Sequence, residues 1–209
     1  MLQFRHMIIS YQGRECFKIS QGDLSIAINP ISKDSKLKAT NFGADITLIT
    51  TNHPDTNGRE QTSRGDKESF IIDGPGEYET KDIFIKGFLS EGPAGLINTV
   101  YTIAFEGMNL CFLGMLSNPA LGSTTLEAIE NVDILFAPIG GNEVLDASSA
   151  YKLAVSLEPA VIIPMHYDAK ALEQFTKEGG LKVEAMDKFV VKKKDLEGKE
   201  SEIVILKEE

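Results

Sequence analysis

The chain has 209 residues and a formal net charge of −10 at neutral pH, with a sequence pI of about 4.9. Hydrophobic residues make up 42% and charged residues 25%, a balance that is typical of folded globular proteins and excludes a disordered chain. The acidic surplus disfavours broad electrostatic binding to nucleic acid or to anionic membranes. The sequence also contains no apolar run long enough to cross a bilayer.

These bulk properties predict one domain with a sizeable core. We assign residues 7–209 to this single domain and residues 1–6 to an N-terminal extension. The N-terminal residues lack the long apolar segment and the cleavage site of a secretory signal, so we expect a cytoplasmic protein. We expect no nucleic-acid partner and no membrane partner. A homo-oligomer and a small-molecule ligand are both compatible with the sequence.

The first half of the chain has the pattern of short β-strands separated by turns. Apolar runs predict strands over residues 7–13, 15–20, 24–30, 46–51, 70–79 and 83–89. The strand 46–51 is apolar throughout, which favours a central position in a sheet. Residues 98–114 contain two β-rich runs joined by "EGMN", and this pattern predicts a hairpin.

The second half changes its hydrophobic period and predicts helices that alternate with strands. The expected helices cover residues 119–132, 146–159 and 168–180. Asp146 and Asp168 are good N-caps for the last two, and Gly179 and Gly180 end the final helix. The expected strands cover residues 132–140, 160–167, 181–187 and 201–207. The basic stretch 188–194 is interpreted as a strand followed by a solvated turn.

Cys16 and Cys111 both lie inside apolar, strand-like runs, which favours buried free thiols. No nucleophile signature surrounds either residue. A thiol enzyme that uses one of them with a histidine brought close by the fold is an alternative that the sequence leaves open.

Several segments, taken in order, resemble the metallo-β-lactamase fold superfamily, and most of all its ascorbate-phosphate-lactonase-like branch of metal-dependent hydrolases. Three segments are similar to strands that lead into its site: "YQGRECFKI", "LSIAINP" and "ADITLITTNHPD". "GPGEYE" matches a phrase common in this branch, and "NTVYTI" and "NLCFLGM" resemble its central hairpin. "VDILFAPIGG" and "AVIIPMHY" resemble its late strands. The resemblance runs from Met7 to Tyr167 and implies an α/β fold, a four-layer αββα sandwich with a metal site at one edge of its two sheets.

The resemblance also implies a dinuclear metal centre, in which two ions lower the pKa of a bridging water. The family's metal loop carries His-x-His-x-Asp-His, and this chain has Thr51, His53, Asp55 and Thr56 at those positions. His166 stands at the family's final histidine. The candidate metal ligands are therefore His53, Asp55 and His166, with Asp55 and His166 as the candidate catalytic pair.

Other family positions carry residues that bind metals poorly. Met115 stands at the bridging aspartate, Arg14 at the opening histidine and Asn29 at the aspartate of Asp-Pro. No histidine occurs between residues 83 and 97, where Glu91 is the nearest carboxylate. One metal position keeps a single ligand and the other keeps two, whereas catalytic zinc normally has three protein ligands. A bound ion, if there is one, would be zinc or manganese.

The resemblance predicts a cleft around these candidates. Its expected lining consists of Arg14, Asn29, Thr51, Asn52, His53, Thr56, Asn57, Glu77, Met115 and Asp146. We hypothesise that the Arg14 cation takes the space of a metal ion and pairs with Asp55.

Each candidate also has a purely structural interpretation. Asp55 and Thr56 would cap the turn that follows the loop. His166 would be a hydrogen-bonded histidine at the edge of the core. Asp146 would be an N-cap, and Glu77 would belong to a turn with solvated carboxylates.

Two functions follow from these observations. The missing ligands favour a degenerate, non-hydrolytic member of the superfamily with a binding or scaffold role. The survival of "HPD" and "MHY" favours a divergent hydrolase of a phosphorylated small molecule, a lactone or a phosphodiester, which would use Asp55 and His166.

Overall fold

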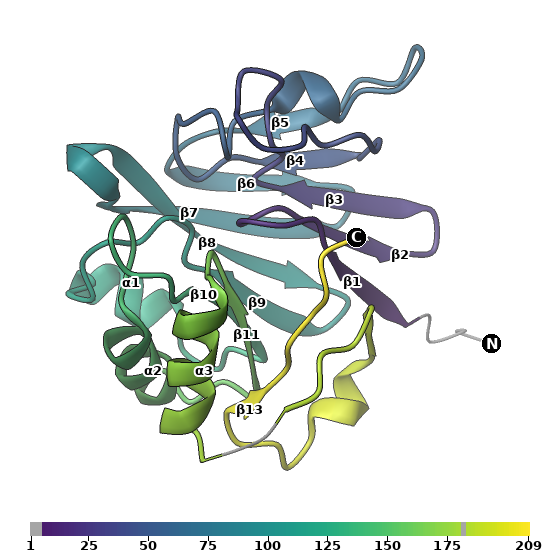
Figure 1. Cartoon of the computed structure of the whole chain (residues 1–209). Coiled ribbons are helices and arrows are strands. Elements are labelled where there is room, and N and C mark those ends of the chain that lie inside the picture. Colours follow the sequence, from purple (N-terminus) through teal and green to yellow (C-terminus); the bar gives the residue numbers. More distant parts are fainter. Residues whose placement is uncertain (1–5, 181–182) are drawn as a thin grey trace.

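Two β-sheets form the centre of the molecule (Figure 1). The structure is a computed structural model, and it describes residues 6–180 and 183–209. Within these residues the strand orders are β12-β1-β2-β3-β4-β5 and β13-β11-β10-β9-β8-β7-β6. Apolar side chains fill the space between the sheets, and Phe17 of the first sheet packs edge-on against Phe112 and Phe136 of the second. This apolar layer accounts for the continuous hydrophobic runs in the sequence.

The first sheet combines antiparallel and parallel strands. Its members are β1 (Met7–Tyr11), β2 (Phe17–Gln21), β3 (Leu24–Ile28), β4 (Ile46–Leu48), β5 (Phe70–Ile72) and β12 (Phe189–Val191). β1, β2 and β3 form an antiparallel meander, and β3, β4 and β5 run parallel. β1, β3 and β4 therefore point the same way, so the segments that follow them leave the sheet at one edge.

The second sheet is antiparallel in its first half and parallel in its second. Its members are β6 (Gly76–Thr80), β7 (Ile83–Glu91), β8 (Ile97–Phe105), β9 (Met108–Phe112), β10 (Ile134–Pro138), β11 (Val161–Met165) and β13 (Glu202–Ile203). β9, β10, β11 and β13 run parallel. The segments after β9, β10 and β11 consequently emerge together at one edge.

The helices cover the outer face of the second sheet (Figure 1). They are α1 (Ser123–Ala128), α2 (Ala147–Ser156) and α3 (Ala169–Glu178). Ala150 of α2 and Phe175 of α3 are buried in the same apolar cluster as Leu135 and Ile162 of the sheet. Short 3-10 turns occur at η1 (Arg59–Gln61), η2 (Pro93–Gly95) and η3 (Lys193–Leu196).

The outer face of the first sheet is covered by the connection between β3 and β4. Ile31, Phe42 and Ala44 of this connection pack with Cys16 and with Ala27 of β3. The expected α/β sandwich is thus confirmed, and the connection makes its fourth layer without an α-helix. The segment is rich in lysine, serine and aspartate and has no helical period, which explains the irregular path.

Several expected elements are shorter than predicted. The helix expected over 119–132 is confined to α1, because Pro119 and Gly122 precede it. The strand expected over 70–79 divides at Gly74 into β5 and β6, which belong to different sheets.

The two strands expected near the C-terminus are also reduced. The strand expected over 201–207 is reduced to β13. In the strand expected over 181–187, Met186 makes an isolated bridge to Leu206. Residues 181–182, and residues 1–5 of the expected extension, lie outside the described residues.

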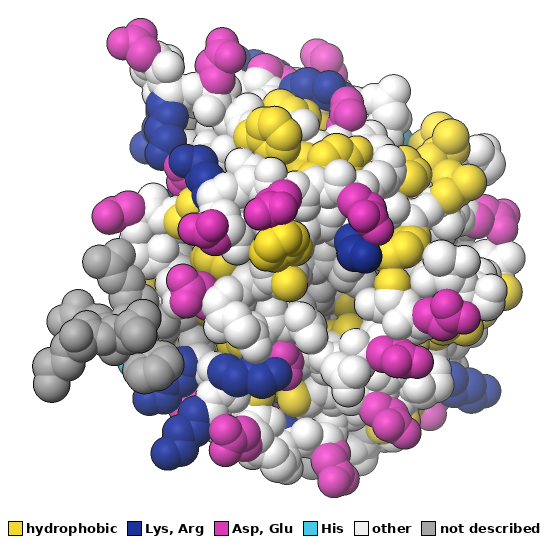
Figure 2. All heavy atoms as spheres, turned by 180° about the vertical axis from the view of Figure 1, so that it is seen from behind, with side chains coloured by type: hydrophobic (Ala, Val, Ile, Leu, Met, Phe, Trp, Pro, Cys, Tyr) yellow, Lys and Arg dark blue, Asp and Glu magenta, His cyan; other side chains and the backbone are white. Residues whose placement is uncertain are grey.

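Hydrophobic side chains also reach the surface. Figure 2 shows them in patches among acidic and basic side chains on one face of the molecule. The exposed large ones include Phe70, Phe84, Leu89 and Ile97. Within the described ranges, none of the helices is both long enough and apolar enough to span a membrane.

Candidate functional site

The candidate residues lie where strand ends of the two sheets meet. The segments that follow β1, β3, β4, β9 and β11 carry Arg14, Asn29, Asp55, Met115 and His166. The His166 N–H donates to the Arg14 carbonyl over 2.7 Å, which joins the segment after β11 to the segment after β1. The strand ends thus bring residues from distant parts of the sequence into contact.

Glu15 is a buried carboxylate at the centre of this region. It is fully inaccessible, and its Oε1 lies 2.7 Å from His166 Nδ1. Its Oε2 accepts a hydrogen bond of 3.0 Å from Asn29 Nδ2. Asn29 Nδ2 also donates to the Thr50 hydroxyl, and Asn29 Oδ1 accepts from the Thr50 N–H. A buried carboxylate needs such partners. Glu15 therefore fixes the imidazole ring of His166 and leaves Nε2 as its outward-facing nitrogen.

The backbone is strained at two neighbouring positions. Arg14 has φ of 55° and His166 has φ of 52°, a region that non-glycine residues rarely adopt. The Arg14 carbonyl accepts hydrogen bonds from His166 N–H and from the Tyr11 hydroxyl, the latter over 2.8 Å. These bonds hold the strained conformation in place. Backbone strain of this kind concentrates at functional sites.

Gly140 allows a close approach between two loops. A Cβ atom at this position would lie 2.1 Å from the carbonyl oxygen of His166. Gly140 also bridges to Asp146, so the loop between them folds back beside His166 and carries Glu143 toward Arg14.

The Arg14 guanidinium lies between two carboxylates. Its Nη2 donates to Glu143 Oε2 over 2.8 Å, and its Nε lies 3.3 Å from Asp55 Oδ2. The second contact is an ion pair without hydrogen-bond geometry. The hypothesis that Arg14 pairs with Asp55 is thus confirmed. The other oxygen of Asp55 accepts a 2.5 Å hydrogen bond from the Ser35 hydroxyl.

Two imidazoles flank the same carboxylates. His53 Nδ1 lies 4.0 Å from Asp55 Oδ2, and His166 Nε2 lies 3.8 Å from Glu143 Oε2. We refer to Arg14, His53, Asp55, Glu143 and His166 as the arginine cluster. Its central cation is 31% exposed and Asp55 is 14% exposed, so the cluster is only partly open to solvent.

The loop that follows β4 is closed by its own hydrogen bonds. The Thr56 hydroxyl donates to the Thr51 carbonyl over 2.7 Å, and the Asp55 N–H donates to His53 Nδ1 over 3.2 Å. At its surface, Asn57 Nδ2 donates to Asn52 Oδ1 over 2.6 Å. The prediction that Asp55 and Thr56 cap the following turn is wrong, because η1 begins after Gly58 without a side-chain cap.

Four of the expected lining residues are buried beneath the cleft. Asn29, Thr51, Thr56 and Met115 are each at most 2% exposed. The Asn98 amide holds two of them, because its Oδ1 accepts from the Thr51 hydroxyl over 3.0 Å and from the Met115 N–H over 2.9 Å. These residues support the loops and present no accessible surface to a ligand.

Two further candidates lie outside the arginine cluster. Glu77 is on the edge strand β6, where it pairs with Lys86 over 3.0 Å. Asp146 caps α2, as its structural interpretation predicts, by accepting bonds of 3.0 Å from the N–H groups of Ser148 and Ser149. Hydrogen bonds from the Ser149 hydroxyl and N–H lower the pKa of Asp146. Its role is therefore to hold the start of a helix.

The sequence reasoning missed Glu15, Asn98 and Glu143. Glu15 precedes the apolar strand β2, and no local pattern marks its carboxylate as buried. Asn98 is the second residue of β8 and Glu143 lies in the loop after β10, and nothing in the sequence marks their partners.

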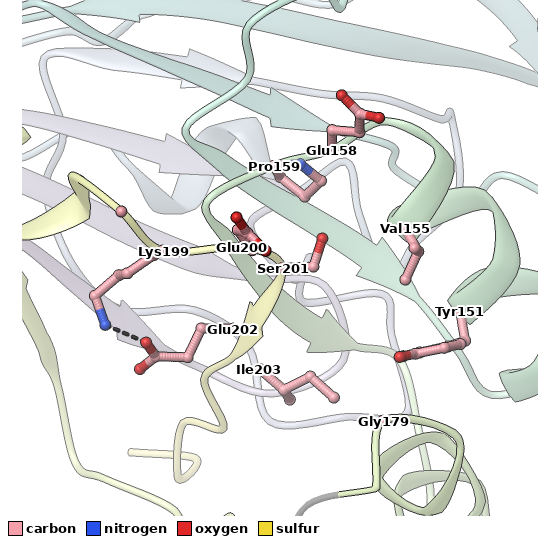
Figure 3. A pocket seen from close by; sticks show the side chains of 11 residues that line it. Tyr151, Val155, Glu158, Pro159, Gly179, Lys199, Glu200, Ser201, Glu202 and Ile203 are labelled. Carbon is pink, nitrogen blue, oxygen red and sulfur yellow. Dashed lines mark hydrogen bonds and ion pairs between the residues drawn. The ribbon is translucent and has the colours of Figure 1, made fainter.

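One cavity lies away from the candidate residues, and a smaller one borders them. A cavity of about 940 Å³ lies between α2, the end of α3 and the segment that leads into β13 (Figure 3). Glu158, Glu200 and Glu202 lie around it, and Lys199 pairs with Glu202.

A smaller cavity of about 390 Å³ borders the arginine cluster and is lined by Arg14, Gly140, Glu143 and His166, among others. We favour this smaller cavity as the site, because His166, which is buried and paired with the buried Glu15 carboxylate, lines it.

Both cysteines have the environment of structural thiols. Burial raises the pKa of Cys16 to about 12, and burial raises the pKa of Cys111 further. Both thiols are consequently protonated at neutral pH, and the thiolate is the nucleophilic form. A thiol enzyme is therefore the least supported of the functions that the sequence left open.

Comparisons with known proteins agree with the fold. A family model described as "Beta-lactamase superfamily domain" matches residues 8–166. A UPF0173 metal-dependent hydrolase of Natranaerobius thermophilus is 23% identical over 205 residues, which cover 82% of this chain and 90% of that protein. A UPF0173 metal-dependent hydrolase of Listeria innocua is 25% identical over 199 residues, which cover 78% of this chain and 86% of that protein.

Solved structures extend the likeness to the whole fold. A Thermotoga maritima protein, described as a Zn-dependent hydrolase of the metallo-β-lactamase superfamily, has a TM-score of 0.79 and 27% identity, and the match covers 96% of this chain and 98% of that chain. The metallo-β-lactamase fold protein YhfI of Bacillus subtilis has a TM-score of 0.63 at 10% identity, with 96% of each chain covered, and shows the fold alone. The chain therefore belongs to the beta-lactamase superfamily and has the metallo-β-lactamase fold.

Proposed function

We propose that this chain is a non-hydrolytic member of the superfamily with a degenerate metal site, and that it binds a ligand in the cavity beside Arg14. The observation that carries the proposal is the position of the Arg14 guanidinium, 3.3 Å from Asp55 and 2.8 Å from Glu143. A fixed cation already neutralises the carboxylates that a divalent ion would need.

The set of side chains supports the same conclusion. Over the described ranges, no group of three or more histidine, cysteine, aspartate or glutamate side chains is arranged to hold a metal ion. A catalytic zinc ion takes three protein ligands and keeps a fourth position for water. The residues at the candidate site do not fit this requirement.

The residues at the family's other ligand positions have different roles in this chain. The hydroxyls of Thr51 and Thr56 donate to Asn98 and to the Thr51 carbonyl, and Met115 is fully buried. Their polar groups are therefore committed to holding the loops. We infer that the loop after β4 keeps its shape for binding and has lost its role in hydrolysis.

Metal content tests the proposal directly. The protein is purified without chelator and offered zinc, manganese and iron separately, and bound metal is measured by plasma mass spectrometry. A His53→Ala/His166→Ala double variant is the matched control, and a related UPF0173 metal-dependent hydrolase is the positive control. We expect the wild type and the double variant to hold the same trace amount. Near-stoichiometric metal in the wild type, lost in the double variant, would contradict the proposal.

The second candidate is a divergent hydrolase that uses Asp55 and His166 on a phosphorylated small molecule, a lactone or a phosphodiester. Two observations favour it: two relatives are described as metal-dependent hydrolases, and the chain keeps Asp55 and His166 at positions where the family has metal ligands. A screen with phosphoesters and lactones distinguishes it. Turnover that is lost in both Asp55→Asn and His166→Ala would establish hydrolysis.

We propose that the protein has no nucleic-acid or membrane partner and that it forms a homo-oligomer. The net charge of −10 supports the absence of a nucleic-acid partner. The exposed apolar side chains on β5, β7 and β8 are compatible with a homo-oligomer, which light scattering after gel filtration would detect.

A further inference from the structure

We propose that the ligand of the cavity beside Arg14 is a small molecule with one carboxylate group and an apolar body, and that its carboxylate takes the place of the Glu143 side chain on the Arg14 guanidinium. The inference rests on the proposed function and deepens it, because it names the class of ligand that the cavity binds. The protein's own Glu143 side chain then competes with that ligand for the same cation.

Glu143 already holds a carboxylate where the polar groups of the cavity meet. Its Oε2 accepts the 2.8 Å hydrogen bond from Arg14 Nη2, and the same oxygen lies 3.8 Å from His166 Nε2. All three residues line the cavity of about 390 Å³. A carboxylate that enters this cavity can therefore face the guanidinium and the imidazole together, as the Glu143 side chain does.

The two carboxylates beside Arg14 differ in how firmly they are held. The Asp55 side chain is 14% exposed and also accepts the 2.5 Å hydrogen bond from the Ser35 hydroxyl. The Glu143 side chain is 50% exposed, and among the described residues its carboxylate makes polar contacts only with Arg14 and His166. An exposed ion pair of this kind contributes little to stability, because water and salt screen it. Asp55 is thus the fixed partner of the guanidinium, and Glu143 is the partner that a ligand can displace.

The charges of the lining favour a ligand with a single negative charge. Replacing Glu143 by one carboxylate leaves one anion on each side of the guanidinium, and a planar carboxylate matches the guanidinium fork. The lining also contains Asp168, whose Oδ1 accepts from the Ala171 N–H over 2.8 Å. Arg14 is the only arginine or lysine in the described lining, so a doubly charged phosphate would lack a second cation and would face Asp168.

A second cavity offers a place for the apolar body. It has a volume of about 380 Å³, and Arg14 and Tyr167 line both cavities, so the two adjoin. The apolar side chains of its lining include Tyr11, Leu172, Ala185 and Leu206. The charged residues Lys207 and Glu208, which also line it, have opposite signs. Largely apolar walls with a few placed polar groups are typical of small-molecule sites. A ligand with its carboxylate at Arg14 can therefore extend its apolar part past Tyr167 into the second cavity.

Isothermal titration calorimetry with 3-phenylpropionate as the probe tests the proposal. Chelator is present throughout, so that a metal ion cannot mediate binding. Acetate lacks the apolar body, 3-phenylpropionamide lacks the charge, and inorganic phosphate carries a higher charge. We expect the wild type to bind 3-phenylpropionate roughly tenfold or more tightly than each of the other three, because each of them loses the ion pair or the apolar contact, or adds a charge that Asp168 repels.

The Glu143→Gln variant tests the competition. It should bind 3-phenylpropionate roughly two- to fivefold more tightly than the wild type, because the neutral amide competes less for the guanidinium. Glu173→Gln is the matched control and should leave the affinity unchanged. Glu173 is an exposed glutamate of α3 that pairs with Lys177 at 3.8 Å and lines neither cavity.

The Arg14→Gln variant tests the cation. It should weaken binding of 3-phenylpropionate by roughly tenfold or more, because the charge-assisted hydrogen bonds are lost. Arg59→Gln is its matched control, since Arg59 forms an exposed ion pair of 2.8 Å with Asp73 and lines neither cavity. Melting by circular dichroism shows whether each variant is folded. If Arg14→Gln does not fold, the comparison between Glu143→Gln and the wild type decides.

The outcomes separate this inference from the proposed function. Equal affinity of Glu143→Gln and the wild type, or binding of the amide or of phosphate as tight as that of 3-phenylpropionate, would overturn the inference. Absence of binding to both proteins would also overturn it and would leave the degenerate metal site standing, because metal content tests that site. Near-stoichiometric metal in the wild type would overturn the proposed function, and binding that chelator abolishes would overturn both.

Discussion

At the scale of single residues, Glu15 connects the two sheets through its side chain. Its carboxylate contacts His166, which follows β11, and Asn29, which follows β3. Because the carboxylate is fully buried, its hydrogen bonds replace all its contacts with water. The orientation of His166, and with it one wall of the cavity, depends on this one side chain.

We therefore predict that Glu15→Ala lowers the free energy of unfolding by about 3 kcal/mol, because it leaves the buried His166 Nδ1 without its partner and removes one of the two hydrogen bonds that Asn29 Nδ2 donates. Glu15→Gln, which keeps the shape and one acceptor, should cost less. Urea unfolding followed by circular dichroism measures both. Glu79→Ala on the exposed side of β6 is the control and should change stability by less than about 0.5 kcal/mol. Equal stability of Glu15→Ala and the control would show that Glu15 has no such role.

At the scale of elements, the loop after β10 depends on a glycine. It carries Glu143 to Arg14 and passes against the backbone at His166, and only a residue without a Cβ fits at position 140. The contact is with a carbonyl oxygen, which cannot turn away as a flexible side chain can.

Gly140→Ala should consequently destabilise the protein by about 3 kcal/mol or more, because a loop or strand end must shift to admit the methyl group. Gly122→Ala is the matched control, since a Cβ there meets nothing within 4 Å and the backbone is ordinary, with φ of −64°. Thermal unfolding of the two variants gives the comparison. Similar melting temperatures for both would mean that the loop is not held against His166.

The start of β4 is fixed by an ionised side chain. Asp45 accepts from the Ser25 N–H over 2.9 Å and pairs with Lys67 over 2.7 Å. Burial alone would raise the pKa of Asp45, but the Lys67 and Ser25 interactions outweigh it and hold the pKa below its ordinary value. The ionised form is therefore favoured in the folded protein.

A depressed pKa in the folded state adds stability above the unfolded value of about 3.9, and this contribution is lost as the pH falls through the lower folded value. Asp45→Asn should thus lower stability near neutral pH and flatten the acid-side loss between about pH 5 and pH 3 relative to the wild type. Urea titrations at several pH values measure the slopes. Parallel slopes in wild type and variant would contradict the assignment.

At the scale of the whole molecule, the sequence predicted the strands and the class of fold well, because apolar runs and their order are local signals. It predicted the Arg14–Asp55 pair from the resemblance, which aligned two distant positions on one site. It did not predict that Asn29, Thr51, Thr56 and Met115 are buried, or that Glu15 and Glu143 belong to the site. Those facts depend on how the loops pack against each other, and no local pattern encodes that packing.

The central claim is that a guanidinium takes the place of a metal ion between the two sheet edges. Diffraction from crystals grown with zinc, recorded on both sides of the zinc absorption edge, tests this most directly. We predict no anomalous peak at the cleft and a guanidinium of Arg14 between Asp55 and Glu143. An anomalous peak within bonding distance of Asp55 and His166, with Arg14 turned away, would contradict the account.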